Sequence, residues 1–189
     1  ANLDILTAQK NDALIIPQGK SMNDYSDEDL AVVRNKKMGF IFQAFNLLPR
    51  TSVLENVKLP LLYSDVKESL WNEMALKAID SVGMAHRIDY EPAHLSGGEK
   101  QRIAIARALV NDPSVIFADE PTGNLDSKSG SQVMEILEKL HIEGRTIILV
   151  THETYTAEYA RRLIKIKDGL IEVDQLVEQK HRHQNGFLK

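Results

Sequence analysis

Two adjacent carboxylates, Asp119 and Glu120, are the strongest sign of chemistry in this sequence. They directly follow residues 115–118, four apolar residues that predict a buried strand. Open α/β sheets bind their ligands at the carboxyl ends of their strands. There, Asp119 suits a Mg²⁺ ligand and Glu120 a general base that orients and deprotonates water. Taken alone, however, the pair is equally consistent with the solvated end of an ordinary strand.

A second pattern with chemical potential is the run Ser96-Gly97-Gly98-Glu99, which precedes a helix predicted to reach about residue 110. Glycines leave backbone N–H groups accessible at a helix N-terminus, which favours an anion. Ser96 and Glu99 also have the spacing of an ordinary capping box. A cap does not need two successive glycines, which weaken a first helical turn, so the pair favours an anion site.

These two patterns resemble motifs of one family. Residues 95–101 are similar to the signature motif of ATP-binding-cassette (ABC) ATPases, and residues 115–120 to its Walker B strand with the catalytic glutamate. Three more motifs match in the expected order: Gln43 the Q-loop, residues 124–126 the D-loop, and His152 the switch histidine. On these five motifs the chain is identified as a member of that family.

The resemblance implies that ATP and Mg²⁺ lie between two ATPase domains bound head to tail. Asp119 would serve Mg²⁺, and Gln43 would sense both Mg²⁺ and the attacking water. Glu120 would be the general base and His152 would contact the γ-phosphate. Asp126 would couple the two sites.

The signature run would hold the nucleotide of the opposite subunit, which makes Ser96, Gly97, Gly98 and Glu99 cofactor-binding residues. The partner is expected to be a second copy or an intact ABC ATPase domain. Together the two would couple ATP binding and hydrolysis to transport.

Residues 42–49 and 120–126 most resemble the branch of lipoprotein-releasing, macrolide-export and cell-division ATPases. The resemblance therefore implies a membrane permease as partner, contacted by residues 44–63, and a cytoplasmic location on the inner face of the cell membrane. Two alternatives stay open: a non-transport module of the cell-division type and a non-catalytic interaction fragment. A DNA-repair cassette is disfavoured because no coiled-coil or zinc-bearing insertion is visible.

The family's phosphate-binding Walker A loop, G-x-x-x-x-G-K-[ST], is absent from these 189 residues. Gly19-Lys20-Ser21 does not qualify, because Leu14 stands where the first glycine belongs and Pro17 removes a backbone N–H. These residues instead predict a turn after a strand at 13–16. Residues 1–10 would correspond to the helix just beyond the loop, so the fold is expected to lack its N-terminal part.

Without the loop the chain alone is expected to bind ATP poorly and not to hydrolyse it. The sequence leaves three explanations open: a shortened gene product or gene assignment, further residues ahead of Ala1, and a naturally degenerate subunit.

The composition is that of one soluble domain spanning residues 1–189. Lys plus Arg number 23 against 27 Asp plus Glu, and the net charge of −4 gives no electrostatic reason to expect nucleic acid. There are no cysteines, no apolar run approaches a membrane span, and residues 1–10 do not resemble a signal peptide.

Strands that alternate with helices predict an α/β fold. The resemblance specifies a P-loop NTPase-like ABC ATPase fold, with a mostly parallel sheet and a helical subdomain at about residues 44–95. The remaining predicted strands are 38–43, 114–118 and 146–150, and the predicted helices are 26–34, 66–82, 96–110, 127–140 and 156–162.

Near the C-terminus, Asp168-Gly169 predicts a hairpin that joins residues 163–167 to 170–173. Residues 175–189 are predicted to be a polar tail. The tail contains His181 and His183, but further ligands for a metal site are not evident near them.

Overall fold

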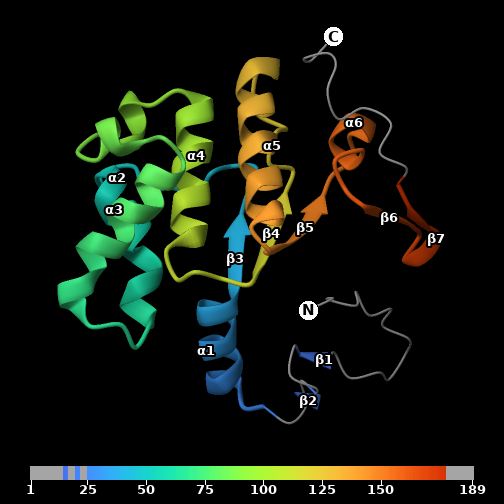
Figure 1. Cartoon of the computed structure of the whole chain (residues 1–189), viewed down its shortest axis with the longest axis horizontal. Helices are drawn as coiled ribbons and strands as arrows, with labels where there is room; N and C mark the ends of the chain where they lie inside the picture. The colour runs from blue at the N-terminus through green and yellow to red at the C-terminus, as the bar shows by residue number, and fades with distance from the viewer. Residues whose placement is uncertain (1–14, 17–19, 22–24, 178–189) are drawn as a thin grey trace.

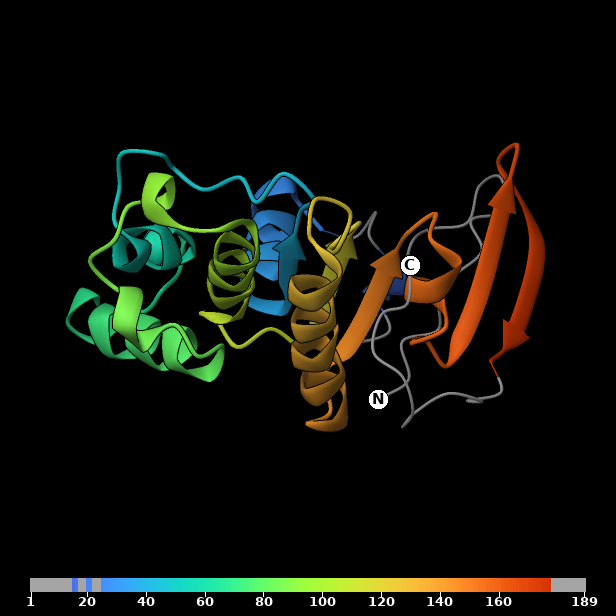
Figure 2. The ribbon, with the colours of Figure 1, turned by 90° about the horizontal axis from the view of Figure 1, so that it is seen from above.

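The computed structural model describes residues 15–16, 20–21 and 25–177. A parallel sheet with two long helices occupies the middle of the molecule (Figure 1). A group of short helices lies at one end and a β-hairpin at the other, as the view from above also shows (Figure 2). The α/β architecture with a parallel sheet, predicted from the sequence, is confirmed.

The sheet consists of β3 (Met38–Ile41), β4 (Val115–Asp119) and β5 (Thr146–Val150), with β4 in the centre. Both pairings are parallel, and Asp119 lies in register with Val150. Because parallel strands end at the same edge, the residues after β4 and β5 meet there. β3 ends two residues earlier than predicted, which leaves Gln43 in the loop beyond it.

Helices α4 (Gly97–Leu109) and α5 (Ser127–Ile142) pack side by side on the sheet (Figure 1). Their inward-facing residues are fully or almost fully buried, among them Ile103, Val133 and Leu137. Burying each such side chain contributes about 1.5–3 kcal/mol. This apolar packing fixes where the first turns of α4 and α5 lie.

A different group of side chains of the sheet is partly open to solvent. Phe40 stacks on Phe117, with ring centroids 5.2 Å apart, and on Phe42 at 6.2 Å. Phe40 and Phe42 remain 40% and 38% exposed. The aromatic rings therefore cover one another while leaving apolar surface in water.

The helical group contains a helix α2 (Val53–Lys58), a helix α3 (Trp71–Ser81) and four short 3₁₀ turns. The turns are η2 (Leu59–Tyr63), η3 (Glu68–Leu70), η4 (Ala85–Arg87) and η5 (Pro92–His94). Asn56 of α2 is completely buried, and its amide bonds the backbone of Leu48 and of residues 51–52. This side chain thereby fixes the loop that leads into α2.

The α3 helix begins five residues later than the predicted start at residue 66. The indole Nε1 of Trp71 donates to Val66 O at 3.0 Å, which folds the preceding segment back on the helix. The apolar stripe of α3 packs as predicted: Ala75 and Ile79 are fully buried, and Trp71 lies against the core. Gly83, with φ of 71°, lies just beyond its end.

Near the N-terminus, β1 (Ile15–Ile16) pairs antiparallel with β2 (Lys20–Ser21). The predicted turn between them and residues 1–10 lie outside the described residues. Helix α1 (Asp27–Lys37) starts at a full capping box between Ser26 and Asp29, as predicted, and runs three residues further than expected.

At the other end, the predicted helix at 156–162 is wrong. Helix α6 covers only Thr154–Ala157, and β6 already begins at Arg162 (Arg162–Lys167). β6 pairs with β7 (Leu170–Leu176) through Asp168 and Gly169, whose φ angles of 51° and 78° suit the predicted tight turn. Strand β7 extends into the segment predicted as tail, and residues 178–189, with His181 and His183, lie outside the described part.

Within the described part of the chain, no helix is both long enough and apolar enough to cross a membrane.

Candidate nucleotide-binding site

Glu120 lies where the chain leaves the carboxyl end of β4. Its φ is 44°, a left-handed conformation that costs a non-glycine residue roughly 1–2 kcal/mol. Its N–H donates to Val150 O at 2.9 Å, which ties this turn to β5. Asp119 is exposed, whereas the Glu120 side chain is only 15% exposed. The two predicted acids are thus adjacent at the sheet edge but differ in environment.

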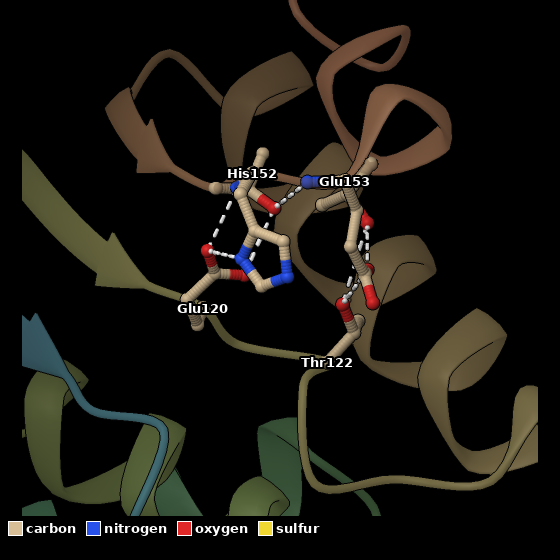
Figure 3. Close-up of polar contacts among 6 residues, drawn as sticks. Glu120, Thr122, His152 and Glu153 are labelled. Carbon is tan, nitrogen blue, oxygen red and sulfur yellow. Dashed lines mark hydrogen bonds and ion pairs between the residues drawn. The ribbon is translucent and has the colours of Figure 1, made fainter.

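The Glu120 carboxylate accepts three hydrogen bonds from the residues that follow β5 (Figure 3). His152 N–H and His152 Nδ1 lie 2.7 and 2.6 Å from Oε1, and Thr151 Oγ1 donates to Oε2 at 2.9 Å. Nδ1 carries the proton in this arrangement, because it faces an acceptor. The His152 ring is 82% exposed, so Nε2 is accessible.

These contacts set the ionisation of Glu120. Burial raises the pKa of the carboxyl, but the hydrogen bonds from the His152 ring, the His152 backbone and the Thr151 hydroxyl outweigh it. The pKa is therefore lowered below its usual value, and Glu120 is an ionised acceptor at neutral pH. A carboxylate offers about four acceptor positions, so three donors leave about one for a water molecule.

A second network, which sequence reasoning missed, adjoins the first (Figure 3). Glu153 N–H donates to Thr151 Oγ1 at 3.0 Å, and Glu153 Oε2 accepts from Thr156 at 2.8 Å and from Thr122 at 3.2 Å. Thr122 and Thr156 are 7% and 1% exposed. The network links the turn after Glu120 to α6. The only signal in the sequence was an acid directly after the histidine, and the burial of the two threonines was not visible there.

The predicted Q-loop residue lies against the same turn. Asn124 Nδ2 donates to Gln43 O at 3.0 Å. A β-carbon on Gly123 would lie only 2.7 Å from Gln43 Nε2, so the absence of a side chain at residue 123 makes room for the Gln43 amide. The structure therefore brings together the loop after β3 and the turn that follows Glu120.

The signature run forms the start of α4. Ser96 is the exposed N-cap: its hydroxyl accepts from Glu99 N–H at 3.3 Å, and Glu99 Oε2 accepts from Ser96 N–H at 2.9 Å. Glu99 Oε1 accepts from Arg87 Nε at 3.0 Å. Hydrogen bonds from the Ser96 backbone, and then from its side chain and Arg87, lower the pKa of Glu99 despite its burial. Both Glu99 oxygens thus have partners in this chain, and a contact of Glu99 with nucleotide stays a prediction.

The glycines of this run also have a packing role. Gly98 is buried, and a β-carbon there would lie 2.7 Å from Ser129 Oγ. Gly97 faces the D-loop with more room, since its β-carbon would lie 3.4 Å from Leu125 Cδ2. Asp126 is the N-cap of α5 and accepts from Ser129 N–H at 3.0 Å and Ser129 Oγ at 2.7 Å. The backbone N–H of Ser129, followed by its hydroxyl, lowers the pKa of Asp126.

The structure thus brings the predicted residues together in two groups. Asp119, Glu120, Gln43 and His152 gather around the sheet edge, and Ser96, Gly97, Gly98, Glu99 and Asp126 at the adjoining starts of α4 and α5. Among the described residues, no three His, Cys, Asp or Glu side chains come together as a metal-binding cluster.

Of the Gly-Lys-Ser segment that the sequence rejects as a phosphate-binding loop, the structure describes Lys20 and Ser21. In a P-loop the lysine and serine open a helix. Here Lys20 and Ser21 form the short strand β2, paired with β1. The rejection made from the sequence is confirmed by this geometry.

Comparisons with known proteins agree with the geometry. A family model described as "ABC transporter" matches residues 5–123. The macrolide export ATP-binding/permease protein MacB of Chlorobium luteolum is 51% identical over 157 residues, which are 83% of this chain and 24% of that protein. The chain therefore spans about a quarter of the length of these macrolide-export relatives. An uncharacterized ABC transporter ATP-binding protein of Bacillus subtilis, YvrO, is 48% identical over 82% of this chain and 68% of its own length.

Solved structures of ATP-binding cassettes also match this chain. The ATP-binding cassette MJ0796, solved as a dimer in a post-hydrolysis state with ADP and Pi, matches with a TM-score of 0.73 and 38% identity. The match covers 85% of this chain and 72% of that one. This chain belongs to the ABC transporter family, and its relatives place it in the branch of ATP-binding domains that includes the macrolide-export ATPases.

Proposed function

We propose that this chain is the ATP-binding subunit of an ABC transporter and contributes to two composite sites in a head-to-tail dimer. One contribution is hydrolytic, with Glu120 as the general base. The other is the signature run from Ser96 to Gly98, which would hold the γ-phosphate bound by the second cassette. The observation that carries the proposal is the ionised Glu120 carboxylate, held by His152 and Thr151 at the sheet edge.

In this proposal the side chains have distinct tasks. Glu120 keeps about one acceptor position for the attacking water and takes its proton. His152 is oriented through Nδ1, and its exposed Nε2 would contact the γ-phosphate. Asp119 and Gln43 would hold Mg²⁺ through side-chain oxygens, the ligand type that this ion prefers. Bound Mg²⁺ would neutralise charge on the phosphates.

The 189 residues alone are expected to bind MgATP weakly and not to hydrolyse it, since no P-loop cradle is among them. Loss of several backbone donors and a lysine should weaken binding more than tenfold, the change that about 1.4 kcal/mol produces. Calorimetric titration of MgATP into this chain and into the Bacillus subtilis relative compares the two directly. Equal affinity together with turnover by the 189-residue chain would refute this part of the proposal.

The signature contribution can be tested by complementation. The Bacillus subtilis relative, with a signature glycine of its own changed to aspartate, cannot complete a site in its homodimer. Adding this chain should restore ATPase activity, because Ser96 to Gly98 would complete the site of the relative. The matched control is Gly97→Asp in this chain: the β-carbon has room there, and a carboxylate suits a first helical turn but repels phosphate. No rise with the unmodified chain, or an equal rise with Gly97→Asp, would contradict the proposal.

We further propose that residues 44–63 contact the permease. Leu48, Leu62 and Tyr63 are 46%, 57% and 79% exposed in this segment. Co-purification with the membrane part of the Chlorobium macrolide-export relative is the measurement. Leu62→Glu should abolish it, whereas the control Ile142→Glu, at a similarly exposed residue on α5, should not. Loss with both variants, or with neither, would contradict this contact.

A further inference from the structure

Helix α4 reaches the turn after Glu120 through Gln101. Gln101 is completely buried, and its Nε2 donates to Pro121 O at 2.8 Å. Its Oε1 has no hydrogen-bond partner among the described residues. A buried amide with an unpaired oxygen is unfavourable for stability, and a leucine of similar size would avoid it. The hydrogen bond to the residue next to Glu120 is what an apolar side chain could not supply.

The same helix reaches the loop after Gln43 through Arg107. Its Nη2 donates to Phe45 O at 2.8 Å and its Nη1 to Asn46 O. Phe45 and Asn46 have φ angles of 61° and 51°, so two successive non-glycine residues are left-handed. Such a backbone persists only where its surroundings hold it. The planar guanidinium binds both carbonyls at once, which a single-point donor does less well.

We propose that α4 positions both hydrolytic elements of its own chain: Gln101 holds the backbone at Glu120, and Arg107 holds the loop that begins at Gln43. The assignment of these two loops as hydrolytic rests on the function proposed above. Both α4 residues are positioning residues, since each acts on the loop backbone through a carbonyl oxygen. The helix that presents Ser96 to a second cassette would thereby also shape the catalytic edge of its own sheet.

The test is NMR of the whole 189-residue chain, in which the one-bond Cα–Hα coupling reports the sign of φ residue by residue. Gln101→Leu should change the coupling at Glu120, and Arg107→Met should change it at Phe45 and Asn46. Ile103→Val, a fully buried variant on the same helix, provides the control for a general loss of stability. Couplings at Glu120 and Phe45 that stay unchanged in both test variants would overturn the inference.

Complementation separates positioning from folding. In the mixed dimer described above, this chain contributes its signature run, while the P-loop and catalytic glutamate of the working site come from the relative. Arg107→Met, which lies outside the signature motif, should therefore leave complementation unchanged while it alters the couplings at Phe45 and Asn46. Loss of complementation together with altered couplings would mean that Arg107 only stabilises the fold. Should the unmodified chain fail to complement, the proposed function fails, and the NMR couplings still decide the role of α4.

Discussion

Replacing Gly98 with alanine should destabilise the chain, whereas the same change at Gly97 should not. A β-carbon at residue 98 would lie 2.7 Å from Ser129 Oγ and 2.8 Å from Ser129 Cβ, about 1 Å short of ordinary contact. The Ser129 side chain is not free to turn away, because its hydroxyl bonds Asp126 at 2.7 Å. At Gly97 the nearest atom, Leu125 Cδ2, would be at 3.4 Å, an ordinary contact.

The size of the effect follows from two opposing contributions. Overpacking a tight site costs about 1–3 kcal/mol, and the better helix propensity of alanine offsets up to about 1 kcal/mol of it. With the full offset, the free energy of unfolding of Gly98→Ala should therefore fall by up to about 2 kcal/mol, which lowers Tm by up to about 8 °C for a chain of this size. Gly97→Ala should lie between no change and a gain of about 1 kcal/mol.

Urea unfolding followed by far-ultraviolet circular dichroism, without nucleotide, measures this difference. Adding Ser129→Gly to Gly98→Ala removes the obstructing β-carbon and should recover part of the loss, after correction for Ser129→Gly alone. If the Gly97 and Gly98 variants unfold at the same urea concentration, close packing is not why residue 98 must be glycine. A double variant less stable than the sum of its parts would also contradict the packing explanation.

Three further changes test the networks around the site. The lowered pKa of Glu120 means that its ionised form contributes stability above its usual pKa, which is lost as pH falls through the folded-state value. The urea midpoint should therefore drop less on acidification in Glu120→Gln than in the unmodified chain. Equal drops would contradict a stabilising role of the ionised Glu120 carboxylate. Thr156→Val removes a buried donor to Glu153 and should cost about 1–3 kcal/mol in urea unfolding, whereas Thr154→Val, an exposed control on the same helix, should be nearly neutral. Asn56→Ala leaves several buried backbone groups unpaired and should cost about 3 kcal/mol or more by the same measurement, so a loss well below that would contradict the role given to its amide.

Elements with strong local signals could be predicted from the sequence. The central strands are short apolar runs, and the bounds predicted for β5 are those observed. The capping boxes at Ser26 and Ser96 bond as their spacing indicated, because a cap involves only residues three apart. The acids after β4 and the histidine after β5 meet because parallel strands end at one edge.

Features that depend on distant residues could not be predicted. The stretch at 156–162 has no helix breaker, yet Arg162 pairs with Leu176 and its guanidinium bonds Asp174 at 2.8 Å. Strand pairing across the hairpin thus overrides the local preference of these residues for a helix. The buried contacts between Thr122 and Glu153 likewise join residues 31 apart, and their burial is set by how α6 packs.

The tight packing at Gly98 was also hidden, since it depends on Ser129, a residue on another helix. From the sequence, the two signature glycines had a single explanation, access of an anion to the backbone. The structure adds close packing as a second explanation for Gly98, whereas access of an anion stays the one explanation for Gly97, where a β-carbon has room.

The position of Trp71 has a practical consequence for watching the protein unfold. It is the one tryptophan of the sequence and lies at the start of α3, in the helical group. Its fluorescence therefore reports on that end of the molecule, while the parallel sheet is silent in this signal. Superimposable fluorescence and circular dichroism transitions would mark the two parts as a single cooperative unit, and an earlier shift in emission would reveal a helical group that melts independently.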